Sequence, residues 1–248
     1  MRGCLPKKPT STGVARPSSL GYRAPVEQQD VDAALEAAIH SDGDAMEHVG
    51  PVLEAYSARI KRMLSLRMDQ RVSGRVGVSD VMQDAYIEVV RRLPAYLAED
   101  DEPKEGKGGR MPFFLWVRFL AGQALQQTHR QHLGTVGRDA GRDVPMHASG
   151  APEASSLMLA NALVDSGISP SGIAVQEEQR SALNDALSSL GADDREILFM
   201  RHFEQLSNHE IAELLRLTPG GASLRHLKAL GRLQRALAQL GIKYDPPV

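Results

Sequence analysis

The chain has 248 residues, of which 42% are apolar, 24% are charged and only 4% are aromatic. At roughly 150 residues per domain, this length corresponds to one or two domains and suffices for a hydrophobic core without disulfide or metal staples. The single cysteine, Cys4, excludes an internal disulfide, and no apolar run approaches the roughly 20 residues of a membrane span. We therefore expect a cytoplasmic protein with no membrane segment.

Charge is segregated along the chain although the formal net charge is only −2. Residues 214–244 contain six Lys or Arg and no Asp or Glu, and residues 110–138 contain four Arg and no carboxylate. Two separate basic stretches in a nearly neutral chain indicate two places that meet an anion.

The pattern along the chain divides it into four parts. Residues 1–30 are rich in Pro, Ser, Thr, Gly and basic side chains without periodicity, and are expected to form a disordered tail. Helical spacing runs through residues 31–133 and 177–242, whereas residues 134–176 carry Gly, Pro and Ser and predict a linker. The sequence therefore predicts an all-α chain of two helical domains joined by a flexible linker.

The first informative helix is predicted over residues 80–93, with Ser79 as its cap and Pro94 ending or bending it. Its wide apolar stripe consists of Val81, Met82, Ala85, Tyr86, Val89, Val90 and Leu93. The opposite face is polar but carries Ile87 in its middle, as a partner-docking surface would. A single exposed apolar side chain without a role is the alternative.

A second helix is predicted over residues 113–132. Its polar face combines Arg, Gln and His side chains with one aromatic ring, Phe119. Cations for the backbone, a ring for stacking and amides for base edges are the groups that bind single-stranded nucleic acid. The open alternative is that Phe119 packs on a neighbouring helix.

Residues 207–220 predict a helix-turn-helix. Ser207 and Glu210 form a capping box before a short helix over residues 210–215, and Thr218-Pro219 begins a second helix. Arg216 occupies a turn position that often holds Gly, and a left-handed conformation there would cost about 1 kcal/mol.

The second of these helices has a basic face. At 100° per residue, four cations share an arc of about 80° that also contains Gly221. They are Arg225, Lys228, Arg232 and Arg235. Such a face suits the major groove of duplex DNA. A solvated charged face is the alternative, but the lack of carboxylates over residues 214–244 favours nucleic acid.

Four segments, in this order, resemble one family. Residues 79–86 (SDVMQDAY) and the spacing of Phe113, Trp116, Val117, Leu120, Gln123 and Arg130 are similar to two parts of region 2 of bacterial RNA polymerase sigma factors. Residues 190–198 and the helix-turn-helix resemble region 4. The likeness is to the extracytoplasmic-function class of the sigma-70 family, and it spans about residues 45–133 and 177–240.

The resemblance implies a region 2 helical bundle over residues 31–133, a region 4 helix-turn-helix domain over residues 177–242, and a role in promoter recognition and DNA melting with core RNA polymerase. The core polymerase-binding residues would be Asp80, Gln83, Asp84, Ile87 and Arg91. Promoter minus-10 DNA would meet Arg118, Phe119, Gln123, Gln126, Gln127 and Arg130, and minus-35 DNA would meet Thr218, Gly221, Ser223, Arg225, Lys228 and Arg232. Gln123 and Gln127 depart from the family's usual Asn and Asp, so the promoter sequence does not follow.

Two other classes of function remain to be weighed. A stand-alone helix-turn-helix regulator that binds duplex DNA as a dimer would explain the second half equally well. For an enzyme there is no P-loop, nucleophile elbow or dinucleotide fingerprint, and the histidines at 129, 132, 202 and 209 lack partners at metal-ligand spacing. We therefore expect the histidines to be surface residues or helix-face contacts, and we expect no catalytic residue, metal or cofactor. Whether an anti-sigma factor binds, or the tail and linker regulate instead, stays open.

Overall fold

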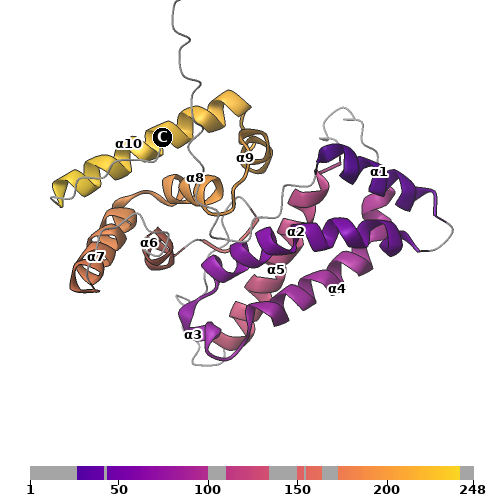
Figure 1. The fold of residues 1–248 in the computed structure, drawn as a ribbon, viewed down its shortest axis with the longest axis horizontal. Coiled ribbons are helices and arrows are strands. Elements are labelled where there is room, and N and C mark those ends of the chain that lie inside the picture. Colours follow the sequence, from indigo (N-terminus) through magenta and orange to yellow (C-terminus); the bar gives the residue numbers. More distant parts are fainter. Residues whose placement is uncertain are drawn as a thin grey trace, which may run out of the picture.

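The computed structural model describes residues 27–41, 44–99, 110–133, 150–153, 155–163 and 173–240. Within these ranges the chain is helical and contains no β-strand, which confirms the all-α prediction. Helices α1 to α5 form one half and α6 to α10 form the other, and the two halves lie against each other (Figure 1).

The N-terminal half is a bundle around three long helices. It comprises α1 (Gln28–Ile39), α2 (Ala45–Arg67), α3 (Gln70–Ser73), α4 (Val78–Leu97) and α5 (Phe113–Leu133). Ile60 of α2, Val89 of α4 and Leu120 of α5 are almost completely buried where the apolar faces of these helices meet. Tyr96 stacks on Trp116 with ring centroids 4.4 Å apart, which ties the end of α4 to α5.

Helix α4 is longer at both ends than the sequence predicts. Gly77, not Ser79, is its N-cap, and the Gly77 backbone N–H donates to the Asp80 carboxylate at 2.9 Å. Pro94 lies inside the helix, which continues to Leu97. A proline removes one backbone donor, and the burial of Tyr96 in the last turn offsets that loss.

The C-terminal half is built around α10. It comprises α6 (Ser156–Leu163), α7 (Ile173–Ser189), α8 (Ala192–His202), α9 (Asn208–Leu215) and α10 (Pro219–Gln239). Helix α10 packs on α7, α8 and α9. Its buried face carries small Ala222 and Ala229 next to Leu233 and Leu237, so that neighbouring helices approach closely.

Part of the predicted linker over residues 134–176 is folded. Ala151, Leu159 and Ala160 are buried, and α6 packs on α7 and α2. The rest of that segment, apart from the start of α7, lies outside the described residues, as do residues 1–26 of the predicted tail. The domain limits 31–133 and 177–242 stay predictions.

Candidate binding surfaces

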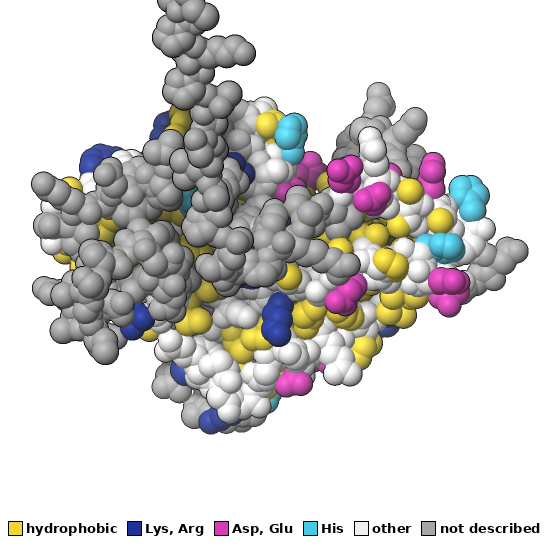
Figure 2. Space-filling model, in the orientation of Figure 1, with side chains coloured by type: hydrophobic (Ala, Val, Ile, Leu, Met, Phe, Trp, Pro, Cys, Tyr) yellow, Lys and Arg dark blue, Asp and Glu magenta, His cyan; other side chains and the backbone are white. Residues whose placement is uncertain are grey.

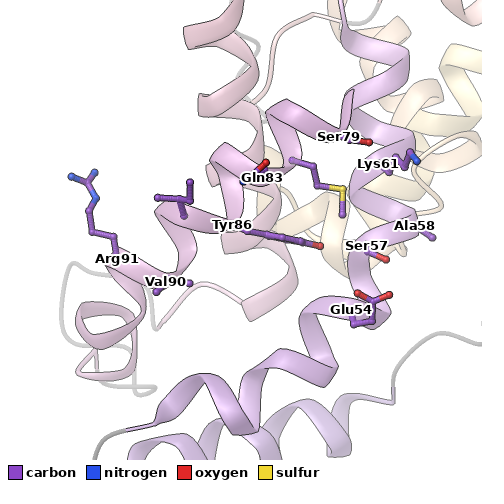
Figure 3. A pocket seen from close by; sticks show the side chains of 11 residues that line it. Glu54, Ser57, Ala58, Lys61, Ser79, Gln83, Tyr86, Val90 and Arg91 are labelled. Atoms are coloured by element: carbon purple, nitrogen blue, oxygen red, sulfur yellow. The ribbon is translucent and has the colours of Figure 1, made fainter. Parts of the chain in front are cut away.

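An apolar groove of about 930 Å³ runs between α2 and α4 (Figure 3). Its lining consists of Glu54, Ser57, Ala58, Lys61, Ser79, Met82, Gln83, Tyr86, Ile87, Val90 and Arg91. Ile87 is 57% exposed and Val90 is 49% exposed, so two large apolar side chains meet solvent on one face of α4. Figure 2 shows hydrophobic side chains gathered on the visible face of the N-terminal half, with acidic side chains around them.

The groove is preformed by a side chain that crosses it. The Tyr86 ring points from α4 toward α2 (Figure 3), and its hydroxyl donates to the Leu53 carbonyl oxygen at 3.3 Å. A tyrosine hydroxyl is a donor at neutral pH at its ordinary pKa of 10, and burial raises the pKa of Tyr86 further, to about 12. Arg91 points away from the groove floor at its edge.

The structure brings together three of the five residues predicted to bind polymerase. Gln83, Ile87 and Arg91 line the groove, whereas Asp80 caps α4 through Gly77 and Asp84 is exposed without lining it. The buried face of α4 is narrower than the apolar stripe in its sequence. Val90, predicted to lie in the core, is exposed beside Ile87. The α2 wall was missed, because no signal in the sequence shows which face of α2 lies along α4.

The residues predicted to meet minus-10 DNA lie on α5 with very different exposure. Gln127 and Arg130 are exposed, and Phe119, Gln123 and Gln126 are half-buried. Arg118 is fully buried, so the prediction of a solvent-facing cation is wrong for this arrangement. Phe119 packs against Gly150, where an added Cβ would come within 2.6 Å of the ring, so the ring is packed inside the molecule, here against a non-helical segment.

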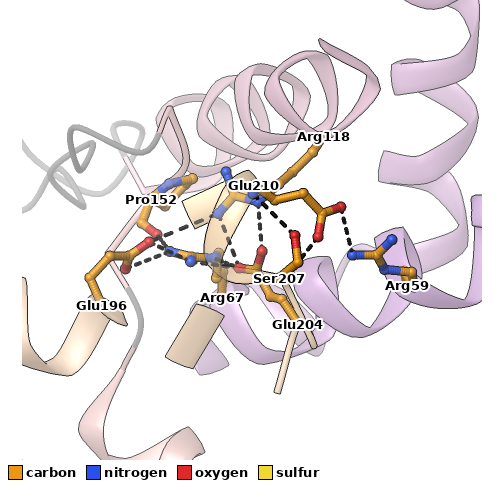
Figure 4. A network of polar contacts seen from close by, with 8 residues as sticks. All are labelled: Arg59, Arg67, Arg118, Pro152, Glu196, Glu204, Ser207 and Glu210. Carbon is orange, nitrogen blue, oxygen red and sulfur yellow. Dashed lines mark hydrogen bonds and ion pairs between the residues drawn. The ribbon is translucent and has the colours of Figure 1, made fainter. Parts of the chain in front are cut away.

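Arg118 is buried because it belongs to a polar cluster between the two halves of the chain (Figure 4). We call Arg67, Arg118, Glu196 and Glu204 the interhalf cluster. None of the four side chains is more than 2% exposed. Arg118 Nε donates to Glu204 Oε2 at 2.6 Å, and Arg67 Nη2 donates to Glu196 Oε1 and Glu204 Oε1, each at 2.6 Å. The cluster therefore pairs two arginines with two carboxylates.

Electrostatics keep the cluster charged. Burial on its own would raise the pKa of Glu204, but Arg118 and Arg67 outweigh it and lower the pKa to about 2. Arg67 Nη1 also donates to the Pro152 carbonyl oxygen at 2.6 Å. A second, partly exposed bridge joins Arg59 of α2 to Glu210 of α9 at 3.1 Å.

The helix-turn-helix forms as predicted. Ser207 Oγ accepts from the Glu210 N–H at 3.1 Å, and the Glu210 carboxylate accepts from the Ser207 N–H at 2.7 Å, which confirms the capping box. Arg216 has φ 53 and is left-handed. Thr218 Oγ1 accepts from the Gly221 N–H at 3.0 Å, so Thr218 and Gly221 both belong to the N-terminal cap of α10.

The basic face of α10 meets carboxylates after all. Arg225 bridges Asp193 at 2.7 Å and Arg232 bridges Asp194 at 2.6 Å, and both acids belong to α8. Residues 214–244 contain no carboxylate, as stated, but the inference that their cations lack acidic partners is wrong for Arg225 and Arg232, because the acids come from another helix. Lys228 is exposed and forms no ion pair among the described residues, and Ser223, five residues earlier on the same helix, is half-buried.

The four histidines considered in the sequence differ in exposure: His202 and His209 are exposed, His132 is half-buried and His129 is buried. The Nε2 of His129 accepts from the Asp69 N–H at 3.1 Å, so the prediction of a surface position is wrong for this residue. His202 of α8 and His226 of α10 face each other with their Nε2 atoms 2.9 Å apart. Burial, and then the neighbouring His202 and Arg201, lower the pKa of His226 to about 4.

The comparisons with known proteins bear on both halves. Residues 180–240, which include α8, α9 and α10, match the family model for sigma-70, region 4. The chain is also 26% identical over 211 residues, 85% of its own length, to the ECF RNA polymerase sigma factors SigD of Mycobacterium tuberculosis and Mycobacterium bovis, and 85% of their length is covered. Together the two matches support a sigma factor of the sigma-70 family, in the extracytoplasmic-function class, that directs transcription initiation.

Two other kinds of feature are absent from the part of the chain that the structure describes. No helix in the described part of the chain is long and apolar enough to cross a membrane. No group of three or more His, Cys, Asp or Glu in that part is arranged to hold a metal ion.

Proposed function

We propose that this sigma factor binds core RNA polymerase through the groove between α2 and α4. The observation that supports this is the pair of exposed apolar side chains, Ile87 and Val90, on the segment that resembles the polymerase-binding part of region 2. A preformed apolar floor with charged residues at its edge, Lys61 and Arg91, has the composition of a protein interface. Asp80 and Asp84 flank the groove on the same helix.

We propose further that α5 and α10 contact promoter DNA. Gln123, Gln126, Gln127 and Arg130 offer amides and a cation to melted minus-10 DNA. Arg118 and Phe119 lie on the same helix. Arg118 can contact DNA only after its ion pair with Glu204 breaks, and Phe119 only after its ring separates from Gly150.

On α10, duplex minus-35 DNA would meet Ser223, Arg225, Lys228 and Arg232. Thr218 and Gly221 shape the helix N-terminus: Pro219 has no N–H and the Gly221 N–H donates to Thr218 Oγ1, which leaves the Gly220 N–H for a phosphate. To bind phosphate, Arg225 and Arg232 must first give up their ion pairs with the α8 carboxylates. Lys228 can bind phosphate without breaking an ion pair among the described residues.

The proposal assigns this chain a binding role and leaves the chemistry of RNA synthesis to the polymerase, in the cytoplasm. It involves no catalytic residue and no cofactor. It takes residues 31–133 and 177–242 as the two functional domains. Regulation by an anti-sigma factor is not part of it, because no described surface singles out such a partner.

The direct test is co-elution of the full-length chain with bacterial core RNA polymerase in size-exclusion chromatography at moderate salt. The proposal predicts a stoichiometric complex. A chain that binds duplex DNA as a stable dimer and fails to co-elute with polymerase would instead be a stand-alone helix-turn-helix regulator.

A further inference from the structure

We propose that Leu224 of α10 determines specificity by packing on the 5-methyl group of one thymine in the minus-35 element. The inference rests on the proposed binding of duplex minus-35 DNA by α10. The other residues proposed to meet this DNA are cationic or polar, or shape the helix N-terminus. Leu224 adds a side chain whose contact with a base has to be apolar, and that chemistry names the base.

Leu224 lies on the side of α10 that faces away from the core of the C-terminal half. The buried side chains of α10, from Ala222 to Leu237, lie roughly 140–220° around the helix axis from Leu224. Leu224 is 53% exposed, and Leu227, one turn later, is 60% exposed. Two large apolar side chains thus meet solvent on the outer side of the second helix of a helix-turn-helix, where any further apolar contact has to come from a partner.

The position of Leu224 along the helix is the one that reaches bases. It lies in the second turn of α10, which begins at Pro219, and the N-terminal residues of a recognition helix contact base edges in the major groove. Gly220 precedes it by one turn on the same side. A Cβ added to Gly220 would meet nothing within 4 Å among the described residues, so no contact inside that part of the protein requires glycine there. Without a side chain at Gly220, the helix backbone can approach the bases closely enough for a leucine to reach them.

Cations adjoin Leu224 on one continuous surface. Leu224 borders a hollow of about 400 Å³ between α10 and α8. The charged residues that line this hollow are Asp193, Asp194, Arg225, Lys228 and Arg232. Cations beside an exposed apolar side chain suit duplex DNA, because phosphates line the edges of the groove and the base edges form its floor. The core of a protein interface is instead depleted of charged residues.

The chemistry of the major groove then selects thymine. Each base pair presents hydrogen-bond donors or acceptors in this groove, and thymine adds the only methyl group. The leucine side chain has neither donor nor acceptor. Against the edge of guanine, adenine or cytosine it would bury a polar group without a partner, which costs free energy. Against thymine it buries the methyl group, which is favourable.

The test uses holoenzyme reconstituted from the full-length chain and bacterial core RNA polymerase. Wild-type holoenzyme first selects binding sites from a pool of random duplexes. Each thymine of the upstream element, on either strand, is then replaced singly by deoxyuridine, which lacks only the methyl group. We expect one thymine at which this replacement weakens wild-type binding about fourfold, the effect of burying one carbon group less. Leu224→Ala should bind the thymine duplex more weakly than wild type and lose nothing further with deoxyuridine at that position.

Leu240→Ala is the matched control. Leu240 is also exposed, at 46%, but it lies at the other end of α10, about 24 Å further along the helix. This variant should bind as wild type does and keep the fourfold dependence on the methyl group. Circular dichroism should show the same helix content in wild type and both variants, because both substitutions are at exposed positions.

The inference is wrong if no thymine responds in wild type, or if Leu224→Ala keeps the fourfold response. A Leu224→Ala variant that forms holoenzyme less well and keeps the methyl response would place Leu224 against the polymerase, which also overturns it. Failure of the proposed function has a different signature, in which wild type forms no complex with core polymerase or enriches no duplex. That result removes the basis of the inference as well.

Discussion

Replacing Ile87 with arginine would place a guanidinium in the middle of the groove between α2 and α4. A fully buried isoleucine contributes about 1.5–3 kcal/mol, and Ile87 is 57% exposed, so roughly half of that remains to be gained from a partner. Burying the new charge against an apolar partner adds a penalty of similar or larger size. The sum is on the order of 3 kcal/mol, which corresponds to polymerase binding about a hundredfold weaker.

The assay is a titration of labelled sigma factor with core polymerase at fixed salt. Ile39→Arg is the control, because Ile39 is also exposed, at 46%, but lies at the end of α1 and does not line the groove. We expect the control to bind polymerase within about twofold of wild type, and both variants to keep their affinity for duplex DNA. Wild-type polymerase affinity in Ile87→Arg would show that the partner docks elsewhere.

Three further predictions concern the helix-turn-helix. Arg216→Gly should raise the free energy of unfolding by up to about 1 kcal/mol, because glycine adopts the left-handed turn without strain, whereas Glu213→Gly inside α9 should lower it by about as much; chemical denaturation measures both. Lys228→Ala should reduce the salt slope of duplex DNA binding by about one without changing sequence preference, and an unchanged slope would place Lys228 off the DNA. The folded pKa of His226 is about 4, below its ordinary 6.5, so stability is complete above pH 6.5 and falls as the pH drops from 6.5 to 4. In thermal melts, His226→Gln should flatten that fall and the exposed His209→Gln should leave it as in wild type.

Local signals in the sequence predicted the helix-turn-helix well. Ser207 and Glu210 cap α9, and Thr218 with Pro219 begins α10, because each signal consists of hydrogen bonds within four residues of chain. Arg216 does not have the residue type that favours a left-handed turn, yet it adopts that conformation, with φ 53. The two caps depend on no distant segment, so the sequence alone suffices to place them.

The groove between α2 and α4 could be predicted only in part from the sequence. Helical periodicity shows that α4 has an apolar stripe, but the stripe is wider than the surface its neighbours cover. Which edge stays exposed depends on how α2 crosses α4, so Val90 was assigned to the core and belongs beside Ile87 instead. The α2 wall, with Ser57 and Lys61, is defined only by that crossing.

Charge was the least predictable property, because opposite charges meet from distant parts of the sequence. The basic stretches on α5 and α10 contain no carboxylate, yet α8 and the turn after it supply one to Arg118, to Arg225 and to Arg232. The same acidic element thus faces both proposed DNA-binding surfaces. DNA phosphates have to displace its carboxylates, so each of these arginines exchanges one ion pair for another when DNA binds. The net gain in charge contacts is therefore smaller than the count of cations suggests, and Lys228, which has no such carboxylate among the described residues, contributes a new contact in full.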